Sequence, residues 1–203
     1  MSLSYEESRE TKLHQQDNES KKISIAYHFE KIMEELGLDL SDPSLKDTPR
    51  RVAKMLVDET CHGLFSEPPA ITTFPLDKST SRDLVIIRNI PFNSLCEHHF
   101  QPFMGTATVA YLPNDKIMGL SKAARVVDYF SSRPQIQERL TGQIADSLMT
   151  KLHARGVLVM VKAEHMCMAV RGVKKHGSTT LTTAIRGDID KQDVISSLQL
   201  EGK

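Results

Sequence analysis

The 203-residue chain contains no tryptophan, and aromatic residues make up only 5% of it. Because proteins that bind single-stranded nucleic acid stack bases on aromatic side chains, this scarcity argues against a base-stacking surface. The 26 lysines and arginines balance the 26 aspartates and glutamates, so no overall field attracts a polyanion. We therefore expect neither a nucleic acid nor a membrane as a partner. Any bound anion must be held by a local cluster of cations.

Cysteines and long apolar runs are also scarce. No stretch approaches the roughly 18 apolar residues that are needed to span a membrane. The three cysteines, Cys61, Cys96 and Cys167, are too few and too scattered for a disulfide framework. Because the chain also shows no signal-like start, this usage favours reduced thiols in a cytoplasmic protein.

The apolar residues divide the chain into three segments. Residues 1–22 are polar and have almost nothing to bury, which predicts a disordered tail. Residues 23–65 are predicted to form an N-terminal helical segment. Its first helix is ended by Gly37, and its second is opened by Thr48-Pro49, read as an N-cap followed by proline at the first helical position. Residues 66–203 remain as the larger domain.

The larger domain alternates between strand-like and helix-like patterns. Strands are expected over residues 84–87, 107–112, 157–167 and 179–185, and helices over 121–131, 134–155 and 190–199. Two strands, two consecutive helices and two more strands predict an α+β fold, with helices against one face of an antiparallel sheet. In the longer helix, apolar residues recur every four positions from Ile136 to Leu152, which predicts a buried stripe before Gly156 ends the helix.

The run Cys-Glu-His-His at residues 96–99 is typical of a metal site. The two-residue gap between Cys96 and His99 lets one turn present a sulfur and an imidazole to the same ion. Cys167 can supply a third ligand, and three protein ligands leave the fourth tetrahedral position open, as catalytic zinc sites do. Cys167 could instead be a small buried apolar residue, and such short motifs also occur by chance. Cys61 is a possible fourth ligand, although a core position in its helix is favoured.

Three polar residues remain around this predicted site without a metal role: Glu97, His98 and His165. If residues 157–167 form one strand, the side chains of His165 and Cys167 share a face about 6.5–7 Å apart. We therefore expect His165 to lie beside the metal. Either imidazole is suited to act as a general acid or base near neutral pH.

Several cations occupy positions that suit a phosphate group. They are Lys122 and Arg125, which follow Ser121 at the start of a helix, Arg51 and Lys54 on the earlier helix, and Arg171 after the last cysteine. Each one taken alone is better explained as a solvated surface charge. Gln137 and Glu138 open the long helix, where a carboxylate can accept two N–H groups from a guanine edge or simply complement the helix dipole.

Five motifs, in order, resemble the GTP cyclohydrolase I family over residues 23–187. They are DTPRRVAKM (47–55), LCEHHFQPF (95–103), ATVAYLPNDKIMGLSKAAR (107–125), RPQIQERLTGQIAD (133–146) and EHMCMAVRGV (164–173). The resemblance implies the tunnelling fold and a toroidal homo-decamer with active sites between subunits. The implied reaction converts GTP and water to 7,8-dihydroneopterin triphosphate and formate, the first step of pterin biosynthesis. Residues beyond 187 match the family weakly.

The resemblance also implies a role for each matched residue. It implies that Zn²⁺ is bound by Cys96, His99 and Cys167, and that His98 and His165 handle protons. It places Ser121 and Glu97 in the site and implies that Glu138, with Gln137, anchors the guanine. The cations implied to face the triphosphate are Arg51, Lys54, Lys122, Arg125 and Arg171.

The sequence allows three other interpretations. The first is a relative of the same fold with different chemistry, such as a nitrile reductase that uses a cysteine nucleophile. The second is a non-catalytic, zinc-stabilised assembly protein that binds GTP. The third is a family member that stops after ring opening. Three metal-type ligands, the cation set, and the presence of His98, His165 and Glu138 favour the complete reaction.

Overall fold

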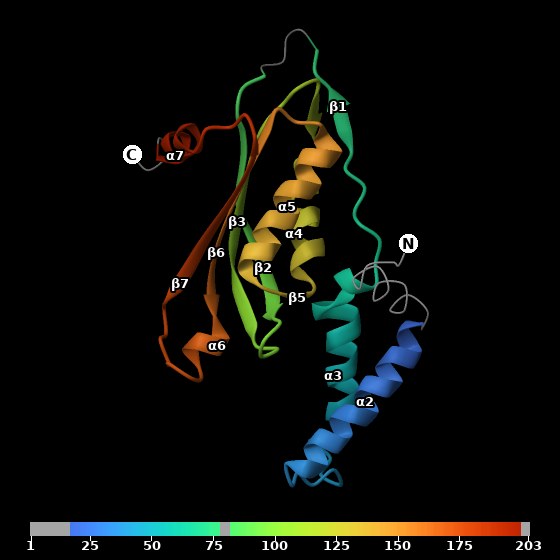
Figure 1. The fold of residues 1–203 in the computed structure, drawn as a ribbon. Coiled ribbons are helices and arrows are strands. Elements are labelled where there is room, and N and C mark those ends of the chain that lie inside the picture. The colour runs from blue at the N-terminus through green and yellow to red at the C-terminus, as the bar shows by residue number, and fades with distance from the viewer. Residues whose placement is uncertain (1–16, 78–81, 200–203) are drawn as a thin grey trace, which may run out of the picture. The chain divides into compact units, whose positions relative to one another are not determined.

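The computed structural model describes residues 17–77 and 82–199 (Figure 1). The chain divides into two compact units, Met1–Glu67 and Pro68–Lys203. The predicted tail lies mostly outside the described residues, which begin at Asp17. In the described part of the chain, no helix combines the length and the apolar character that crossing a membrane requires.

Within residues 17–67, the first unit is built from two helices and two short helical turns. They are α2 (Asn18–Glu35), α3 (Thr48–Lys54), the π-helical η1 (Met55–Thr60) and the 3-10 turn η2 (His62–Leu64). Helix α2 begins five residues before the predicted start, because the Asp17 carboxylate accepts the backbone N–H of Ser20 at 2.8 Å and caps the helix. The predicted tail is therefore corrected for residues 18–22, which are helical. Gly37 follows α2 in the left-handed conformation (φ 74°), as its predicted role at the helix end requires.

The second helix of this unit differs in detail from its prediction. Its N-cap position is held by Asp47, not by Thr48, and the Asp47 side chain makes no capping hydrogen bond. Proline does occupy the first turn, where its missing N–H costs nothing. The helix widens into a π-helical turn at Met55, which the apolar spacing did not indicate. Met33 of α2 and Ala53 of α3 are buried where the two helices pack together.

The second unit contains a five-stranded sheet in the order β5-β2-β3-β6-β7. Its strands are β2 (Val85–Cys96), β3 (Pro102–Leu112), β5 (Pro134–Gln135), β6 (Gly156–His165) and β7 (Thr179–Gly187). All neighbours are antiparallel except β2 and β5. A separate antiparallel pair, β1 (Thr73–Pro75) and β4 (Lys116–Met118), was not predicted. The sequence thus indicated the antiparallel sheet correctly, but not these short strands.

Two helices, α4 (Ser121–Ser131) and α5 (Gln137–Leu152), cover one face of the sheet (Figure 1). The predicted stripe of α5 is buried: Leu140, Ile144, Leu148 and Leu152 are at most 1% exposed. They pack against inward-facing residues of β3 and β6, such as Val109 and Val159. At one end of the other face, helix α7 (Lys191–Gln199) contributes Val194 to a second, smaller core.

The boundaries of β2 and α5 differ from the prediction. Strand β2 continues well beyond Ile87, because a bulge between Ile87 and Ile90, with Asn89 in the left-handed conformation, interrupts the pairing without ending it. Pro134 does not open α5 but pairs with Leu95 in the short parallel strand. Helix α5 ends at Leu152, with His153 left-handed, before Gly156 begins β6.

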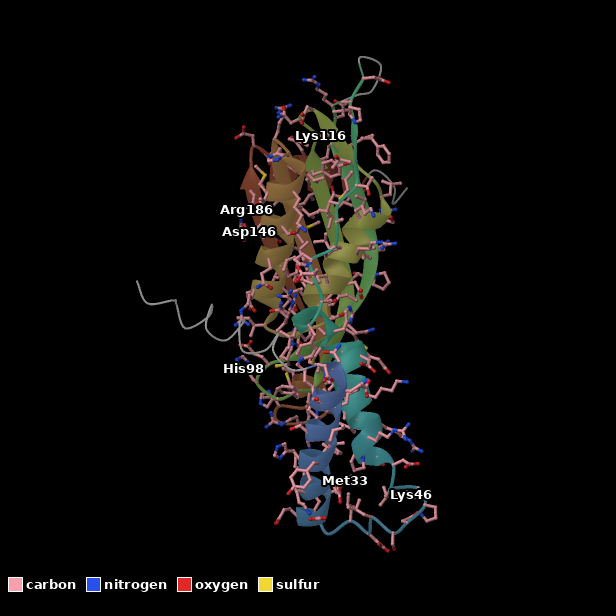
Figure 2. All side chains as sticks on the ribbon, turned by 90° about the vertical axis from the view of Figure 1, so that its right-hand side faces the viewer. Met33, Lys46, His98, Lys116, Asp146 and Arg186 are labelled. Atoms are coloured by element: carbon pink, nitrogen blue, oxygen red, sulfur yellow. The ribbon has the colours of Figure 1, made fainter. Side chains whose placement is uncertain are left out.

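A double salt bridge links the edge strand β7 to helix α5 (Figure 2). The guanidinium of Arg186 lies 2.5 Å from Oδ1 and 3.2 Å from Oδ2 of Asp146. The pair raises the pKa of Arg186 further above its usual range. Paired hydrogen bonds of this kind fix orientation as well as distance.

Candidate active site

The turn between β2 and β3 carries two of the predicted metal ligands. Strand β2 ends at Cys96, and the chain reverses so tightly that the Phe100 N–H reaches the Cys96 carbonyl at 2.8 Å. Phe100 takes up the left-handed conformation that closes the turn (φ 52°). As a result, the imidazole of His99 returns toward Cys96, with Nδ1 4.0 Å from the sulfur.

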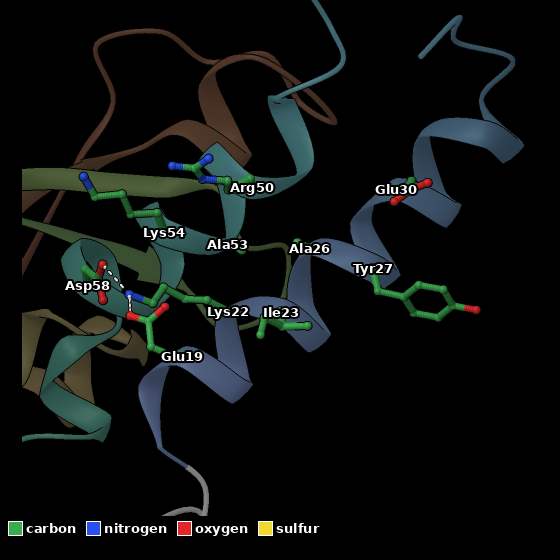
Figure 3. A pocket seen from close by; sticks show the side chains of 10 residues that line it. All are labelled: Glu19, Lys22, Ile23, Ala26, Tyr27, Glu30, Arg50, Ala53, Lys54 and Asp58. Carbon is green, nitrogen blue, oxygen red and sulfur yellow. Dashed lines mark hydrogen bonds and ion pairs between the residues drawn. The ribbon is translucent and has the colours of Figure 1, made fainter. Parts of the chain in front are cut away.

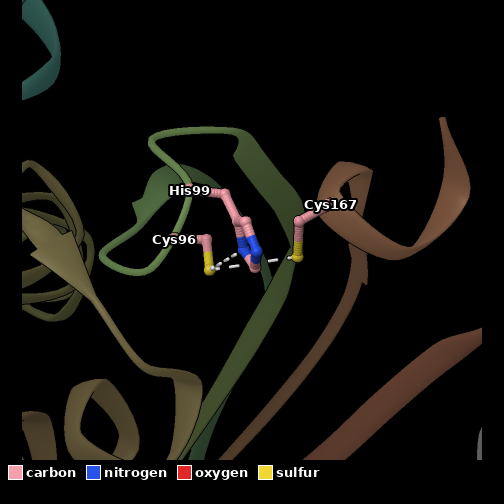
Figure 4. Close-up of side chains that lie close together, drawn as sticks. All are labelled: Cys96, His99 and Cys167. Atoms are coloured by element: carbon pink, nitrogen blue, oxygen red, sulfur yellow. Dashed lines mark hydrogen bonds between the residues drawn. The ribbon is translucent and has the colours of Figure 1, made fainter. Parts of the chain in front are cut away.

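The third predicted ligand does not lie in a strand. Strand β6 ends at His165, and Cys167 belongs to the short helix α6 (Met166–Ala169). The predicted alternation of His165 and Cys167 on one strand face is therefore wrong. The helical turn instead brings the Cys167 sulfur to 3.9 Å from the sulfur of Cys96 (Figure 4).

The three groups form a cluster suited to a metal ion. One ligand atom from each of Cys96, His99 and Cys167 lies within 4.8 Å of the other two. Bond lengths of about 2.3 Å to sulfur and 2.0–2.1 Å to nitrogen imply ligand atoms roughly 3.5–3.8 Å apart around tetrahedral zinc. The separations of 3.9 Å and 4.0 Å from the Cys96 sulfur are close to that range. The donor set therefore fits the predicted ion.

The thiol of Cys167 is held protonated more strongly than usual in the absence of an ion. Burial raises its pKa, and the neighbouring thiol of Cys96 adds to this rise, whereas the positive charge of Arg171 opposes it. Metal binding requires the thiolate, so an ion must displace this proton. All three cysteines are free thiols, and Cys61 lies buried in the first unit, where burial raises its pKa.

His98 and His165 lie beside the cluster in different surroundings. The side chain of His98 is 64% exposed, and its Nδ1 lies 3.9 Å from the Cys96 sulfur. His165 is half-buried and stacks flat on Phe103, with ring centroids 4.6 Å apart and planes 4° apart. Burial lowers the pKa of His165, and the negative charge of Glu138 opposes that shift. His165 is thus the more fixed of the two imidazoles.

Gln137 and Glu138, both expected to bind guanine, point to different places. Glu138 is exposed on the first turn of α5. The side chain of Gln137 is buried, and its amide contacts only protein groups, among them Nε2 of His165 at 2.8 Å. The side chain of Gln137 thus lies behind His165, where protein groups take up its amide, and its part in binding guanine stays a prediction. The sequence did contain a signal for this burial, because Gln137 lies three residues before Leu140 and so shares the buried face of the helix.

Glu97 makes a paired salt bridge that the sequence did not indicate. Both of its carboxylate oxygens accept hydrogen bonds from Arg139, at 2.5 Å and 3.0 Å. These hydrogen bonds lower the pKa of Glu97, with a smaller contribution from the charge of His98. Arg139 was missed because its partner is 42 residues away in the chain. The pair ties the turn of residues 96–99 to the first turn of α5.

The predicted phosphate-binding cations fall in both units. Ser121, Lys122 and Arg125 lie on the first turns of α4, and Arg171 follows α6, all in the second unit. Arg51 and Lys54 belong to the first unit, where they line a hollow of about 270 Å³ with Asp47 and Arg50. The Lys54 side chain also borders a larger hollow of about 620 Å³ between α2 and α3 (Figure 3).

Comparison with known proteins agrees with this chemistry. Residues 25–201 match the model of the family described as GTP cyclohydrolase I. The chain is 51% identical over 170 residues to "GTP cyclohydrolase 1" of Carboxydothermus hydrogenoformans, covering 83% of this chain and 86% of the relative.

Two further relatives carry the same name. The protein from Streptococcus agalactiae serotype V is 45% identical over 188 residues, covering 90% of this chain and 98% of the relative. The one from Citrobacter koseri is 46% identical over 176 residues, with 86% and 79% covered. The match thus extends over both units and includes every predicted site residue. The chain belongs to the GTP cyclohydrolase I family of enzymes.

Proposed function

We propose that this chain converts GTP and water to formate and 7,8-dihydroneopterin triphosphate, the first step of pterin biosynthesis. One observation carries the proposal: ligand atoms of Cys96, His99 and Cys167 converge within 4.8 Å, with His98 Nδ1 3.9 Å from the Cys96 sulfur and His165 two residues before Cys167. Such a site has a place for a metal ion and separate groups for moving protons. The family match and the names of the relatives support GTP as the substrate.

The metal we propose is zinc, bound by Cys96, His99 and Cys167. Two sulfurs and an imidazole nitrogen are ligands that zinc prefers, and three protein ligands are typical of catalytic sites. When bound, the ion supplies the Lewis acidity that makes water a nucleophile near neutral pH, here toward C8 of the purine. The tight turn at Phe100 and the helical turn of α6 hold the three ligand atoms near one another before any ion arrives.

Proton transfer is assigned to His165 and His98, with Ser121 assisting. Burial lowers the pKa of His165, so its imidazole is neutral and able to accept a proton at pH 7. His98 is mostly exposed and stays in exchange with solvent, which suits a group that returns protons during the later rearrangement. Opening the imidazole ring, rearranging the ribose and closing the pterin all require protons to move, so two such groups have distinct tasks.

Guanine recognition is assigned to Glu138. Its exposed carboxylate on the first turn of α5 lies close enough to His165 for its charge to oppose the lowering of that pKa. Guanine offers the N1–H and the 2-amino group side by side, and one carboxylate accepts both. Adenine lacks this pair and would leave the carboxylate unsatisfied, which is the kind of difference that discriminates strongly.

The triphosphate is assigned to the cations of both units: Lys122, Arg125 and Arg171 from the second, and Arg51 and Lys54 from the first. The charge of Arg171 acts on the thiol of Cys167, which supports a position near the metal. Lys122 and Arg125 lie near the amino end of α4, where the helix dipole also favours anions.

We further propose the tunnelling fold and a toroidal homo-decamer with active sites between subunits. Strand β7 supports an assembly of this kind, because it is a nine-residue strand at the edge of the sheet. It exposes Leu181 (64%) and Ile185 (40%). An edge strand with exposed apolar residues is a surface suited to pairing with another chain.

The test is the conversion of GTP by the purified, zinc-loaded protein. We expect formate and a fluorescent pterin in equal amounts from GTP, and neither product from ATP. Metal content is measured on the same sample, so that an inactive preparation without zinc is recognised. If the zinc-loaded protein binds GTP and releases no formate, the proposed reaction is wrong and a binding function replaces it.

A further inference from the structure

Gln137 makes a set of hydrogen bonds that the proposed reaction does not explain. Its side chain is 2% exposed, although it stands at the start of α5 next to an exposed glutamate. The amide nitrogen lies 2.9 Å from the Val161 carbonyl and 3.0 Å from the Thr180 carbonyl, on strands β6 and β7. The amide oxygen lies 2.8 Å from Nε2 of His165. The buried amide thus connects the sheet to a proposed catalytic histidine.

The two carbonyls decide which way the amide faces. A backbone carbonyl only accepts hydrogen bonds, so the groups that face Val161 and Thr180 must be the N–H groups of the amide. The reversed amide would place its oxygen about 3 Å from two other oxygens and would lose both of these hydrogen bonds inside the protein. The Gln137 oxygen must therefore face His165.

Two threonine hydroxyls enforce the same orientation. The Thr141 hydroxyl lies 2.7 Å from the backbone carbonyl oxygen of Gln137, which only accepts, so Thr141 must donate its only hydrogen there. The Thr182 hydroxyl, 2.6 Å from that of Thr141, must then be the donor between the two. With its hydrogen committed, Thr182 can only accept from the amide nitrogen of Gln137, 3.1 Å away.

The orientation of the Gln137 amide also determines which ring nitrogen of His165 carries the proton. An amide oxygen has no hydrogen, so the hydrogen bond between it and Nε2 of His165 exists only when Nε2 carries the proton. The flat stack of His165 on Phe103 holds the ring in the plane in which Nε2 meets that oxygen. We propose that Gln137 is a positioning residue that fixes neutral His165 as the Nε2–H tautomer, leaving Nδ1 as its only basic atom. That Nδ1 exchanges protons with substrate rests on the proposed function.

The tautomer can be observed directly by nitrogen NMR. The full-length, zinc-loaded protein is labelled with ¹⁵N in its eight histidines and studied as a solid, since a large assembly is not an obstacle there. The His165 signals are assigned as those missing from His165→Ala. We expect Nδ1 to resonate as an unprotonated nitrogen and Nε2 as a protonated one. A protonated Nδ1 on neutral His165 in the unsubstituted protein overturns the proposal, whatever the variants do.

A variant tests whether Gln137 causes this preference. Gln137→Met keeps the length of the side chain but removes the acceptor, so we expect signals from both tautomers. With GTP, we expect kcat to fall on the order of 10- to 100-fold, within what a general base contributes. KM should stay within about twofold, because hydrogen bonds to the sheet and to His165 already occupy the Gln137 amide. A Gln137→Met protein that keeps a single Nε2–H tautomer contradicts the proposal.

The matched control is Gln143→Met on the same helix. The Gln143 side chain instead accepts a hydrogen bond from Gln135 at 2.8 Å. We expect this variant to keep the single tautomer. If it too mixes the tautomers, the packing of α5 and not the Gln137 amide decides the proton position, and the proposal fails. The spectra need no turnover, so a protein with the expected tautomer that does not convert GTP would refute the proposed function alone.

Discussion

The guanidinium of Arg139 contacts both carboxylate oxygens of Glu97, with Nη1 2.5 Å from Oε2 and Nη2 3.0 Å from Oε1. The pair joins the turn that carries Cys96 and His99 to the helix that carries Glu138. Its side chains are 44% and 30% exposed, so its direct contribution to the free energy of unfolding should be about 1 kcal/mol or less. Its larger effect should be on the geometry of the turn.

Glu97→Gln is therefore expected to weaken zinc binding more than it weakens the fold. The neutral amide can keep only part of the paired hydrogen bonds, so the turn loses some of its hold on α5. Loss of a group that orients metal ligands typically costs about 10- to 100-fold in affinity, measured here by competition with a chelator. Asp146→Asn breaks a second arginine–carboxylate pair, that with Arg186, and is the control. Equal zinc affinities in the two variants would contradict the orienting role.

Substitution of either metal-binding cysteine should abolish stoichiometric zinc. Cys96→Ser and Cys167→Ser each replace a soft thiolate by a hydroxyl that stays protonated and binds zinc poorly. Elemental analysis of the purified variants measures the result. Cys61→Ala also removes a thiol, but from the core of the first unit, and should keep one zinc per chain. Zinc retained in Cys167→Ser would show that the ligand set is wrong.

Removal of His165 should separate metal binding from product formation. In His165→Ala we expect zinc content to be unchanged, because the imidazole is not among the three clustered ligands. Pterin fluorescence from GTP should fall by about 10²- to 10⁴-fold, the usual contribution of a general acid or base. A variant that loses its zinc would instead make His165 a ligand.

The pH dependence of turnover should reflect the burial of His165. Burial lowers its pKa below the ordinary value of about 6.5, so the neutral, active form persists as the pH falls through that value. We expect kcat to remain level there and to decline only at lower pH. The unfolded chain takes up this proton near pH 6.5, so stability should begin to fall before kcat does. The prediction is refuted if kcat declines with a midpoint above pH 6.5 as the pH falls, and if His165→Ala does not show that decline.

Substitution of two glycines by alanine should change the stability of the fold in opposite directions. A Cβ at Gly105 in β3 would lie 1.9 Å from the Lys162 carbonyl of the paired strand, so Gly105→Ala must push the strands apart. We expect a loss of about 2 kcal/mol or more, as for other overpacked positions. A Cβ at Gly142 in α5 would meet nothing closer than 3.8 Å, so Gly142→Ala should stabilise the helix by up to about 1 kcal/mol. Thermal unfolding midpoints of both variants check the signs; a Gly105→Ala protein as stable as the parent would contradict the first.

Local patterns predicted much of this fold. The spacing of Leu140, Ile144, Leu148 and Leu152 indicated which face of α5 is buried, and alternation from Val157 to Ala163 indicated the inward face of β6. Such periodicity is a direct consequence of 3.6 residues per helical turn and two per strand repeat. The Cys-x-x-His spacing likewise identified Cys96 and His99, because both ligands lie in one tight turn.

The relations between distant segments could not be predicted in this way. Residue spacing placed Cys167 in a strand, whereas the chain turns into helix α6 just after His165. It gave no sign of Arg139 beside Glu97, or of Pro134 pairing with Leu95, since each contact joins segments about 40 residues apart. Register between strands and helices is set by packing of the whole core, which no local pattern contains.

By itself, the sequence determined the chemistry that is present: two thiols and an imidazole suited to zinc, further histidines for protons, and the periodic apolar faces that build an α+β core. Only the tertiary structure decided what each group faces. It turned Gln137 inward, because two strand carbonyls and Thr182 take up its amide nitrogen in the buried space behind His165. A side chain's type is a property of the chain, but its partners depend on which distant segments the core brings into contact.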